Sequence, residues 1–196
     1  WLWSTPVYLP VVMQRYTPPA KYLLISEVDY TGYCEWVEIY NPTAMTVTLT
    51  GFKVGDAQSP GQYEGMYIFS EREMAPGEVI VVAGDATQCN LGFMTVHYEL
   101  VGSHPGIPNL AKDPGWGQPG WHFSLSNSGD EVLLLDPSNV PVDVVVYGAG
   151  SYSGVVAHPL LVDPFDTLER FPANIDTNDC SDDFEPGGSP NFVRLQ

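Results

Sequence analysis

Basic residues are scarce in this chain. Among 196 residues, seven are Lys or Arg and 24 are Asp or Glu, which gives a formal net charge of −17. Proteins that bind nucleic acid need basic side chains to neutralise phosphates, so this composition argues against DNA or RNA as a partner. An anionic membrane surface is disfavoured for the same reason. The charge is compatible with cations or with basic partners instead.

Long hydrophobic runs are also missing. No stretch reaches the roughly 18 apolar residues that a membrane-spanning helix needs, so we expect no transmembrane segment. The chain starts at Trp1 rather than at Met, which fits the removal of a signal peptide or a tag. Residues 1–20 are rich in proline and aromatic side chains. We interpret them as an extended leader or linker that precedes one domain at residues 21–196.

Cysteine is rare, and its spacing excludes one common use. The three cysteines are Cys34, Cys89 and Cys180, and none of them forms a CxxC pair, which argues against a zinc ribbon. In an oxidising compartment the simplest arrangement is one disulfide and one free thiol. Any of three pairings is then open. Three unpaired and partly buried thiols are the alternative.

Helical periodicity is absent as well. No segment shows a sustained apolar pattern at positions i, i+3, i+4 and i+7, and residues 70–75 could form one helical turn at most. Gly (19) and Pro (18) are frequent instead and separate short alternating or apolar runs, as in an all-β sandwich or barrel. These runs predict strands at residues 21–29, 35–40, 46–50, 52–56, 66–69, 79–83, 94–101, 121–125, 130–136 and 141–147.

Two stretches show the clearest strand–turn–strand patterns. Residues 35–51 alternate on both sides of the turn-forming Asn-Pro pair at 41–42, so we predict a strand with one buried side, a turn and a second strand. Residues 130–147 contain two apolar runs joined by a tight turn, which predicts a second hairpin. Asn127 and Gly129 are expected to adopt left-handed conformations in the turn that precedes it.

A series of short stretches resembles, in its order, the lamin tail domain as it occurs in bacterial proteins. The stretches are LLISEV, EWVEIYNPT, VTLTGFKVGD, MAPGEVIVVAGD and LSNSGDEVLLLDPSNVPVDVVVYG, followed by LERF at 168–171, DTNDCSDDF at 176–184 and PGGSPN at 186–191. The resemblance covers about residues 22–191 and implies an all-β, immunoglobulin-like β-sandwich with long loops and a wrapped C-terminal tail. The leader at 1–20 and the Gly/Pro-rich loop at 90–120 depart from the family's pattern.

The resemblance also implies a class of function. Bacterial members resemble exported or surface proteins, often accompany hydrolase domains, and offer no catalytic residues to assign here. We therefore expect a non-catalytic binding or structural attachment module of an exported or cell-surface bacterial protein, in an extracellular or cell-surface location. The alternative is a secreted hydrolase with a carboxylate or metal site in the acidic C-terminal segment, where Asp163 and Asp166 could do acid–base work. A third hypothesis is a purely mechanical spacer.

Motifs for catalysis and for zinc are missing. The sequence contains no GxSxG elbow and no HExxH pair. No Ser or Cys has a recognisable partner at motif spacing among the four histidines, which are His97, His104, His122 and His158. We interpret His104 and His158, each followed by a proline, as loop residues and expect no catalytic residue.

The long loop offers a candidate ligand-binding surface. Trp116 and Trp121 flank a Gly-Pro stretch, with His104 and His122 nearby in the sequence. Flat aromatic faces beside polar groups suit stacking on sugar rings or capture of a peptide, so a carbohydrate or protein ligand is expected. The alternative is that these rings fill a small satellite core.

The acidic tail offers weak candidates for a metal site. Asp176, Asn178, Asp179 and Asp182 lie within a few residues of one another, and calcium accepts six to eight oxygen ligands from irregular loops. The segment lacks the spacing, the Gly and the closing Glu of an EF-hand. The favoured interpretation is that these side chains form Asx-turns and caps. We therefore expect no cofactor, with calcium as the exception to be tested.

Overall fold

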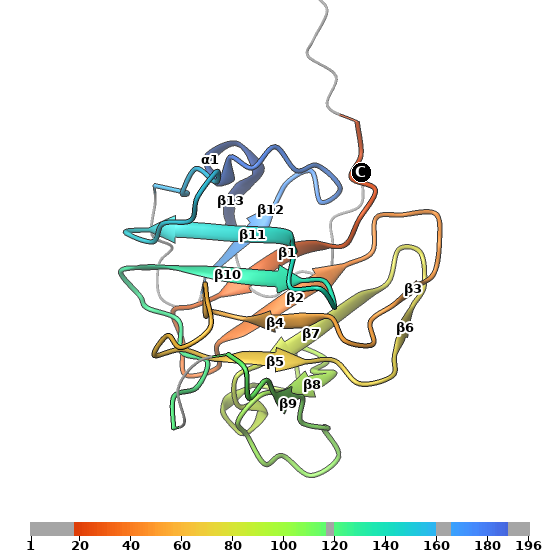
Figure 1. Ribbon diagram of the computed structural model, residues 1–196, viewed down its shortest axis with the longest axis vertical. Helices are drawn as coiled ribbons and strands as arrows, with labels where there is room; N and C mark the ends of the chain where they lie inside the picture. Colours follow the sequence, from red (N-terminus) through yellow and green to blue (C-terminus); the bar gives the residue numbers. More distant parts are fainter. Residues whose placement is uncertain (1–17, 117–119, 160–165, 188–196) are drawn as a thin grey trace, which may run out of the picture.

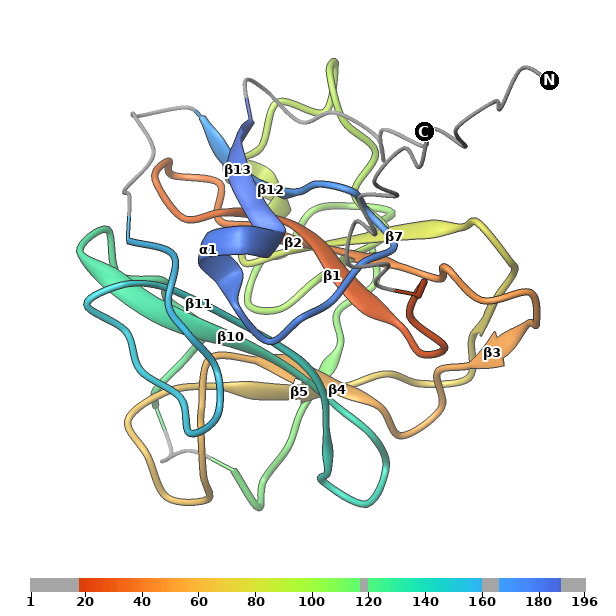
Figure 2. The same ribbon diagram turned by 90° about the horizontal axis from the view of Figure 1, so that it is seen from above.

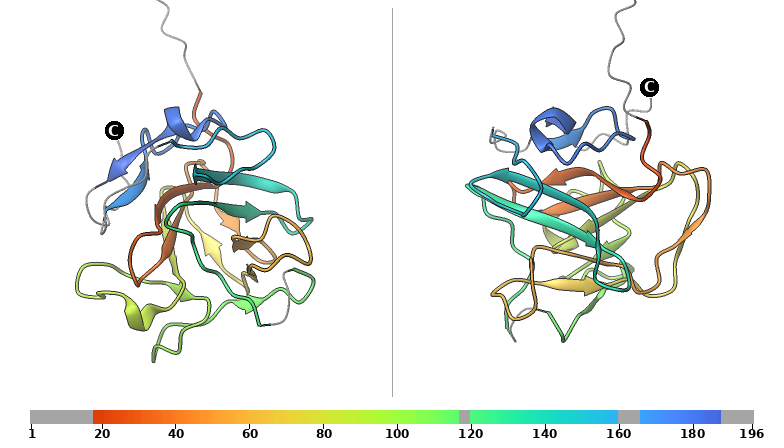
Figure 3. Two further views of the ribbon diagram at one scale, coloured as in Figure 1. Left: turned by 90° about the vertical axis from the view of Figure 1, so that its left-hand side faces the viewer. Right: turned by 45° about the horizontal axis from the view of Figure 1, so that its top comes forward.

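The structure, a computed structural model, describes residues 18–116, 120–159 and 166–187. It is an immunoglobulin-like β-sandwich of two sheets with a small two-stranded ribbon at one side (Figures 1 and 3). The first sheet has the order β13-β12-β1-β2-β7-β8. Its strands are β1 (Leu24–Asp29), β2 (Trp36–Tyr40), β7 (Val79–Ala83), β8 (Tyr98–Glu99), β12 (Thr167–Arg170) and β13 (Phe184–Gly187).

The second sheet has the order β11-β10-β4-β5-β9, and the ribbon pairs β3 with β6. The strands of this second sheet are β4 (Lys53–Gly55), β5 (Met66–Ile68), β9 (Ala111–Lys112), β10 (Gly129–Leu135) and β11 (Pro141–Gly148). The ribbon consists of β3 (Val47–Thr48) and β6 (Glu73–Met74). The described residues also contain a 3-10 helix, η1 (Ala86–Gln88), and a one-turn helix, α1 (Cys180–Asp183), which lies beside β11 and β13 (Figure 2). The all-β fold that the sequence predicted is confirmed.

The main core lies between the two sheets and follows the period-2 pattern of the strands. On β2, Val37 and Ile39 point into it, and Ile80 and Val82 do the same from the neighbouring β7. Each such side chain contributes roughly 1.5–3 kcal/mol when it is fully buried. The core therefore depends on the alternating runs that the sequence displays most clearly.

The outer face of β2 is also buried, which differs from the prediction of one buried side. Trp36 alternates with Val37 and packs with Val81, Met94 and Val96 in a second layer formed by the segment after β7. All five residues of β2 are buried as a result. Alternation identified the strand but could not show that a later segment covers its polar side.

The predicted strand–turn–strand at 35–51 is only half right. β2 ends at Tyr40 as expected, but it pairs with β1 and β7, whereas β3 pairs with β6. Asn41 explains the departure, because its side-chain amide donates to the carbonyls of Met45 and Met74 at 2.9 Å and of Ala75 at 3.0 Å. These bonds hold a crossover in place of a hairpin turn.

Three other local predictions have clear outcomes. The β10–β11 hairpin is confirmed, and Gly129 has the expected positive φ of 137°, whereas Asn127 is not among the positive-φ residues. The possible helical turn at 70–75 is wrong, because β6 occupies part of it as a strand. The short strand β9 was not predicted, whereas β12 and β13 agree with the strand or two that the apolar pieces of residues 148–196 indicate.

The cysteines follow the arrangement of one disulfide and one free thiol. Cys34 and Cys89 are bonded, which links the β1–β2 loop to the residue that follows η1. Cys180 is a free, buried thiol, and burial raises its pKa to about 12. The alternative of three unpaired thiols is therefore wrong. Across the described ranges, no helix combines the length and apolar character needed to cross a bilayer.

Candidate functional site

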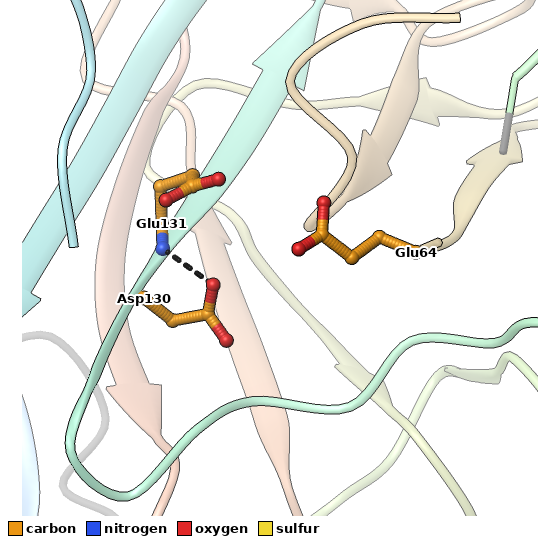
Figure 4. Close-up of side chains that lie close together, drawn as sticks. All are labelled: Glu64, Asp130 and Glu131. Atoms are coloured by element: carbon orange, nitrogen blue, oxygen red, sulfur yellow. Dashed lines mark hydrogen bonds between the residues drawn. The ribbon is translucent and has the colours of Figure 1, made fainter. Parts of the chain in front are cut away.

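Three carboxylates converge at one end of the second sheet. Asp130 and Glu131 lie in the first, turn-proximal part of β10, directly after Gly129, and Glu64 comes from the loop that leads into β5 (Figure 4). Each of the three offers an oxygen, and these oxygens lie within 4.8 Å of one another. Two more carboxylates, Glu35 and Asp56, lie near enough for the charge of Asp130 to act on them. We call these five residues the carboxylate cluster.

Glycines and short loops explain why the cluster forms at this place. Gly129 adopts a φ of 137°, and an added Cβ there would lie 1.9 Å from the backbone N of Ala149, so only glycine permits the start of β10 to approach this segment. Gly65 donates its N–H to Asp56 Oδ1 at 2.8 Å, which fixes the β4–β5 loop behind Glu64. Gln58 from the same loop donates to Glu131 Oε1.

The cluster also holds a segment of backbone that the sequence predicted to be a strand. Three successive N–H groups donate to carboxylates: Ser124 to Asp56 at 2.7 Å, Leu125 to Glu35 at 2.9 Å and Ser126 to Asp130 at 2.7 Å. The predicted strand at 121–125 is therefore wrong, since side chains take the place of a neighbouring strand. Its alternating Phe123 and Leu125 still enter the main core.

Burial controls the protonation of the cluster. It is the main reason why the pKa of Glu35, Asp56 and Glu131 rises to about 7 for each. The negative charge of Asp130 adds to the rise at all three, and burial raises the pKa of Asp130 as well. Close carboxylates with raised pKa values can exchange protons near neutral pH, and once ionised they present the oxygens that hard cations prefer.

The tail residues proposed as calcium ligands form local turn and cap contacts. Asp179 caps α1 by accepting from the N–H of Ser181 at 3.0 Å, and Asp176 accepts from the N–H of Asn178 at 3.1 Å in an Asx-turn. Asn178 itself has a positive φ of 59°, and Asp182 is exposed on α1. These are the turn and cap contacts of the favoured interpretation. In the part of the chain that the structure describes, the converging acidic oxygens belong to Glu64, Asp130 and Glu131 instead.

A buried arginine pairs with two acidic residues of the C-terminal segment. Arg170 of β12 is paired with Asp143 at 2.8 Å, Asp183 at 3.3 Å and Asp176 at 3.5 Å. Burial alone would lower the pKa of Arg170, but the charges of these three aspartates raise it. Arg170 also donates to the carbonyl of Ile25 at 2.9 Å, so the segment is anchored to β1. Asp163 lies outside the described residues, and the carbonyl of Asp166 accepts from Thr31.

The four residues of the predicted ligand surface fall into different environments. Trp116 is 8% exposed and packs against Met66 and Leu133 in a second core cluster, which is the satellite-core alternative. His104 is half-buried, and its backbone N–H donates to Glu99. These two rings are not part of an exposed aromatic surface.

Trp121 and His122 are exposed, and a residue that the sequence did not suggest joins them. Tyr63 is 61% exposed and Trp121 is 48% exposed, and their rings meet edge to face with centroids 5.0 Å apart. The two segments lie side by side because Gly65 has no side chain: a Cβ there would lie 2.7 Å from the backbone N of Phe123. Tyr63 directly precedes Glu64, so this aromatic pair adjoins the carboxylate cluster.

Sequence reasoning missed the cluster because its members are distant in sequence and each resembles an ordinary turn or strand residue. Asp130 and Glu131 belong to the predicted core strand at 130–136, and Glu64 belongs to a predicted loop. The available signal was the Gly that precedes or follows each acidic residue, at Gly65 and Gly129, which marks close approach of the backbone.

Comparison with known proteins agrees with this architecture. The model of the lamin tail domain family matches residues 17–149. No curated protein sequence matches the chain. Nine chains of known structure match it. One is the crystal structure of a DUF4876 family protein from Bacteroides thetaiotaomicron VPI-5482, with a TM-score of 0.61 and 15% identity over 89% of this chain and 73% of that chain. At this identity the likeness concerns the fold alone. The chain belongs to the lamin tail domain family.

Proposed function

We propose that this lamin tail domain is a non-catalytic binding or structural attachment module of an exported or cell-surface protein. The observation that carries the proposal is the exposed pair of Tyr63 and Trp121. Large aromatic side chains that remain exposed next to polar groups are typical of ligand-binding surfaces. Glu64, a partly exposed member of the carboxylate cluster, directly follows Tyr63 and offers a hydrogen-bond acceptor, so a carbohydrate or a peptide with donor groups suits this surface.

Two features support an extracellular location. The Cys34–Cys89 disulfide is the kind of bond that persists in oxidising compartments. The net charge of −17 favours solubility and disfavours anionic surfaces and nucleic acid. Both features agree with an exported module.

The hydrolase alternative has less support in the acidic C-terminal segment. Asp176 and Asp183 pair with Arg170, and Asp179 caps α1, so their carboxylates serve the fold. Acid–base catalysis needs carboxyl groups that can reach a substrate. The binding module is therefore the function that the geometry supports best.

The Trp121→Ala variant tests the proposal. We expect it to lower the affinity for a ligand found on glycan and peptide arrays by about tenfold or more, because aromatic anchors commonly contribute more than about 1.4 kcal/mol. Tyr33→Ala is the matched control, since Tyr33 is 90% exposed but lies in the β1–β2 loop. Equal retention of ligand by wild type, Trp121→Ala and Tyr33→Ala would contradict the role of the aromatic pair.

A further inference from the structure

A buried lysine lies on the outer side of the second sheet. Lys53 opens β4 and alternates with Val54, whose side chain is in the main core, so Lys53 faces the opposite side. Its side chain is 11% exposed, and Nζ lies 5.9 Å from the centroid of the Trp116 ring. Its neighbour on β10 is Leu135, at the entry to the β10–β11 turn. Lys53 therefore sits where the loop after β9 and this turn come together.

Two side chains of different kinds contact the amine of Lys53. Asp113, which follows β9, places Oδ2 at 2.5 Å from Nζ, and its own side chain is 10% exposed. The amide oxygen of Asn139, in the β10–β11 turn, accepts a hydrogen bond from the same Nζ. An amine, an acid and a carboxamide are thus gathered around one nitrogen atom.

The surrounding backbone holds both partners of the lysine in position. Asp113 Oδ1 accepts the N–H of Gly115 at 2.8 Å, which leaves Oδ2 directed at Lys53. Asn139 adopts a positive φ of 66°, and its N–H donates to the carbonyl of Asp136 at 3.0 Å. Neither side chain needs a change of backbone to remain in contact with the amine.

We propose that Lys53 and Asn139 form an intramolecular isopeptide bond, with Asp113 as the acid–base group. The ammonium of Lys53 gives a proton to Asp113, and the neutral Nζ attacks Asn139 Cγ while the protonated Asp113 donates to the amide. The Cγ–Nδ2 bond then breaks, and Nζ gives its second proton to the departing nitrogen, which leaves as ammonium. Lysine ammonium and asparagine amide become one secondary amide and one ammonium ion, and Asp113 returns to a carboxylate.

The arrangement of the three groups favours this reaction. Cγ is bonded to the oxygen that Nζ already contacts, so the attack needs only a small rotation, and groups held in this way react with high effective concentration. The Trp116 ring lies 5.9 Å from Nζ and shields the amine, whereas Asn139 lies in the exposed turn.

The bond would connect two parts of the sheet that are far apart in sequence. Lys53 and Asn139 are separated by 86 positions, so the link would join β4 to the end of the β10–β11 hairpin. Such a link would resist separation of these strands under load. This inference goes beyond the proposed function, because a module that binds nothing could still carry the bond.

The intact mass of the chain, purified after folding at neutral pH and then reduced, tests the proposal. We expect the mass to be lower than that of the sequence by one ammonia, and peptide mapping to show Lys53 and Asn139 in one branched peptide. The full sequence mass would overturn the proposal. Loss of ammonia that maps to Asn139 without Lys53, as in a succinimide, would also overturn it.

Variants separate the reaction from folding. Lys53→Arg and Asp113→Asn are expected to retain the full sequence mass, whereas the matched control Lys112→Arg loses ammonia as the wild type does, because Lys112 contacts the carbonyl of Trp121 instead. The circular dichroism spectra should show that each variant is folded. A branched peptide in the Asp113→Asn variant at wild-type yield would contradict the role of Asp113. Its absence in every sample, wild type included, would overturn the bond itself.

Discussion

At the scale of single residues, Arg170 is the side chain on which the tail depends most. It is almost fully buried, and it is the cation that faces Asp143, Asp176 and Asp183. Buried charges of this kind add little net stability as a group, but removal of one partner leaves the others uncompensated. The C-terminal segment therefore relies on one guanidinium for its attachment to the first sheet.

We expect Arg170→Met to lower the free energy of unfolding by about 3–5 kcal/mol, because it leaves buried carboxylates without a cation. Urea unfolding followed by circular dichroism would measure the loss. Arg72→Met is the matched control: its pair with Glu78 is partly exposed, so its effect should stay within about 1 kcal/mol. Equal losses in the two variants would show that Arg170 contributes only as a surface pair.

At the scale of elements, carboxylates replace a strand. The segment at 124–126 precedes the start of β10. Its N–H groups bond to Asp56, Glu35 and Asp130 rather than to a neighbouring backbone. Because its N–H groups bond to side chains, the segment does not need to run alongside a neighbouring strand. They also make this end of the sandwich sensitive to pH, since burial raises the pKa of these carboxyls.

The protein is expected to be more stable at pH 5 than at pH 8. The carboxyls of Glu35, Asp56 and Glu131 have folded pKa values of about 7, against about 4 in an unfolded chain. Between these values the folded state binds more protons, so stability falls as pH rises and levels off above pH 7. Urea unfolding should show a loss of at least about 2 kcal/mol between the two pH values.

The Glu131→Gln variant should make this pH dependence shallower, because the amide can still accept from Gln58 but cannot ionise. Glu185→Gln, at an exposed position, is the control and should follow the wild type. A wild-type stability that rises from pH 5 to pH 8 would contradict the assigned pKa shifts. Addition of millimolar calcium at pH 8 should restore part of the loss only if the ionised cluster binds the cation.

At the scale of the whole molecule, one covalent link ties segments that the strands alone leave apart. The Cys34–Cys89 disulfide spans 55 positions and closes the β1–β2 loop against the segment that covers the outer face of β2. Native disulfides in exported domains typically contribute about 2–5 kcal/mol, largely by limiting the unfolded chain. Both cysteines pack against the small outer layer that contains Met94 and Val96.

We expect the Cys34→Ser, Cys89→Ser double variant to unfold with a free energy lower by about 2–5 kcal/mol, with the melting temperature lowered accordingly. Differential scanning calorimetry would measure the change. Cys180→Ala is a control that leaves the disulfide intact, and its effect should reflect only the loss of a small buried side chain. If reduction of the wild type left the melting temperature unchanged, the disulfide would have no stabilising role.

The sequence alone determined the local features of this protein. Alternation on β2, the apolar run of β7, the β10–β11 hairpin and the positive φ of Gly129 were predictable, because each depends on residues close together in the chain. The order of the motif stretches was enough to indicate the family. The two-residue strands β6 and β9 were not predictable, because they are too short to show a period.

Tertiary structure decided what depends on residues far apart in the chain. The partner of β3, the pairing of Cys34 with Cys89, and the approach of Glu64 to Asp130 follow from how the sheets pack and which loops meet. Burial also changed the chemistry of side chains that looked ordinary, since a carboxyl acquires its pKa from its surroundings. Local patterns could not supply this information, because distance and solvent exposure are properties of the packed chain.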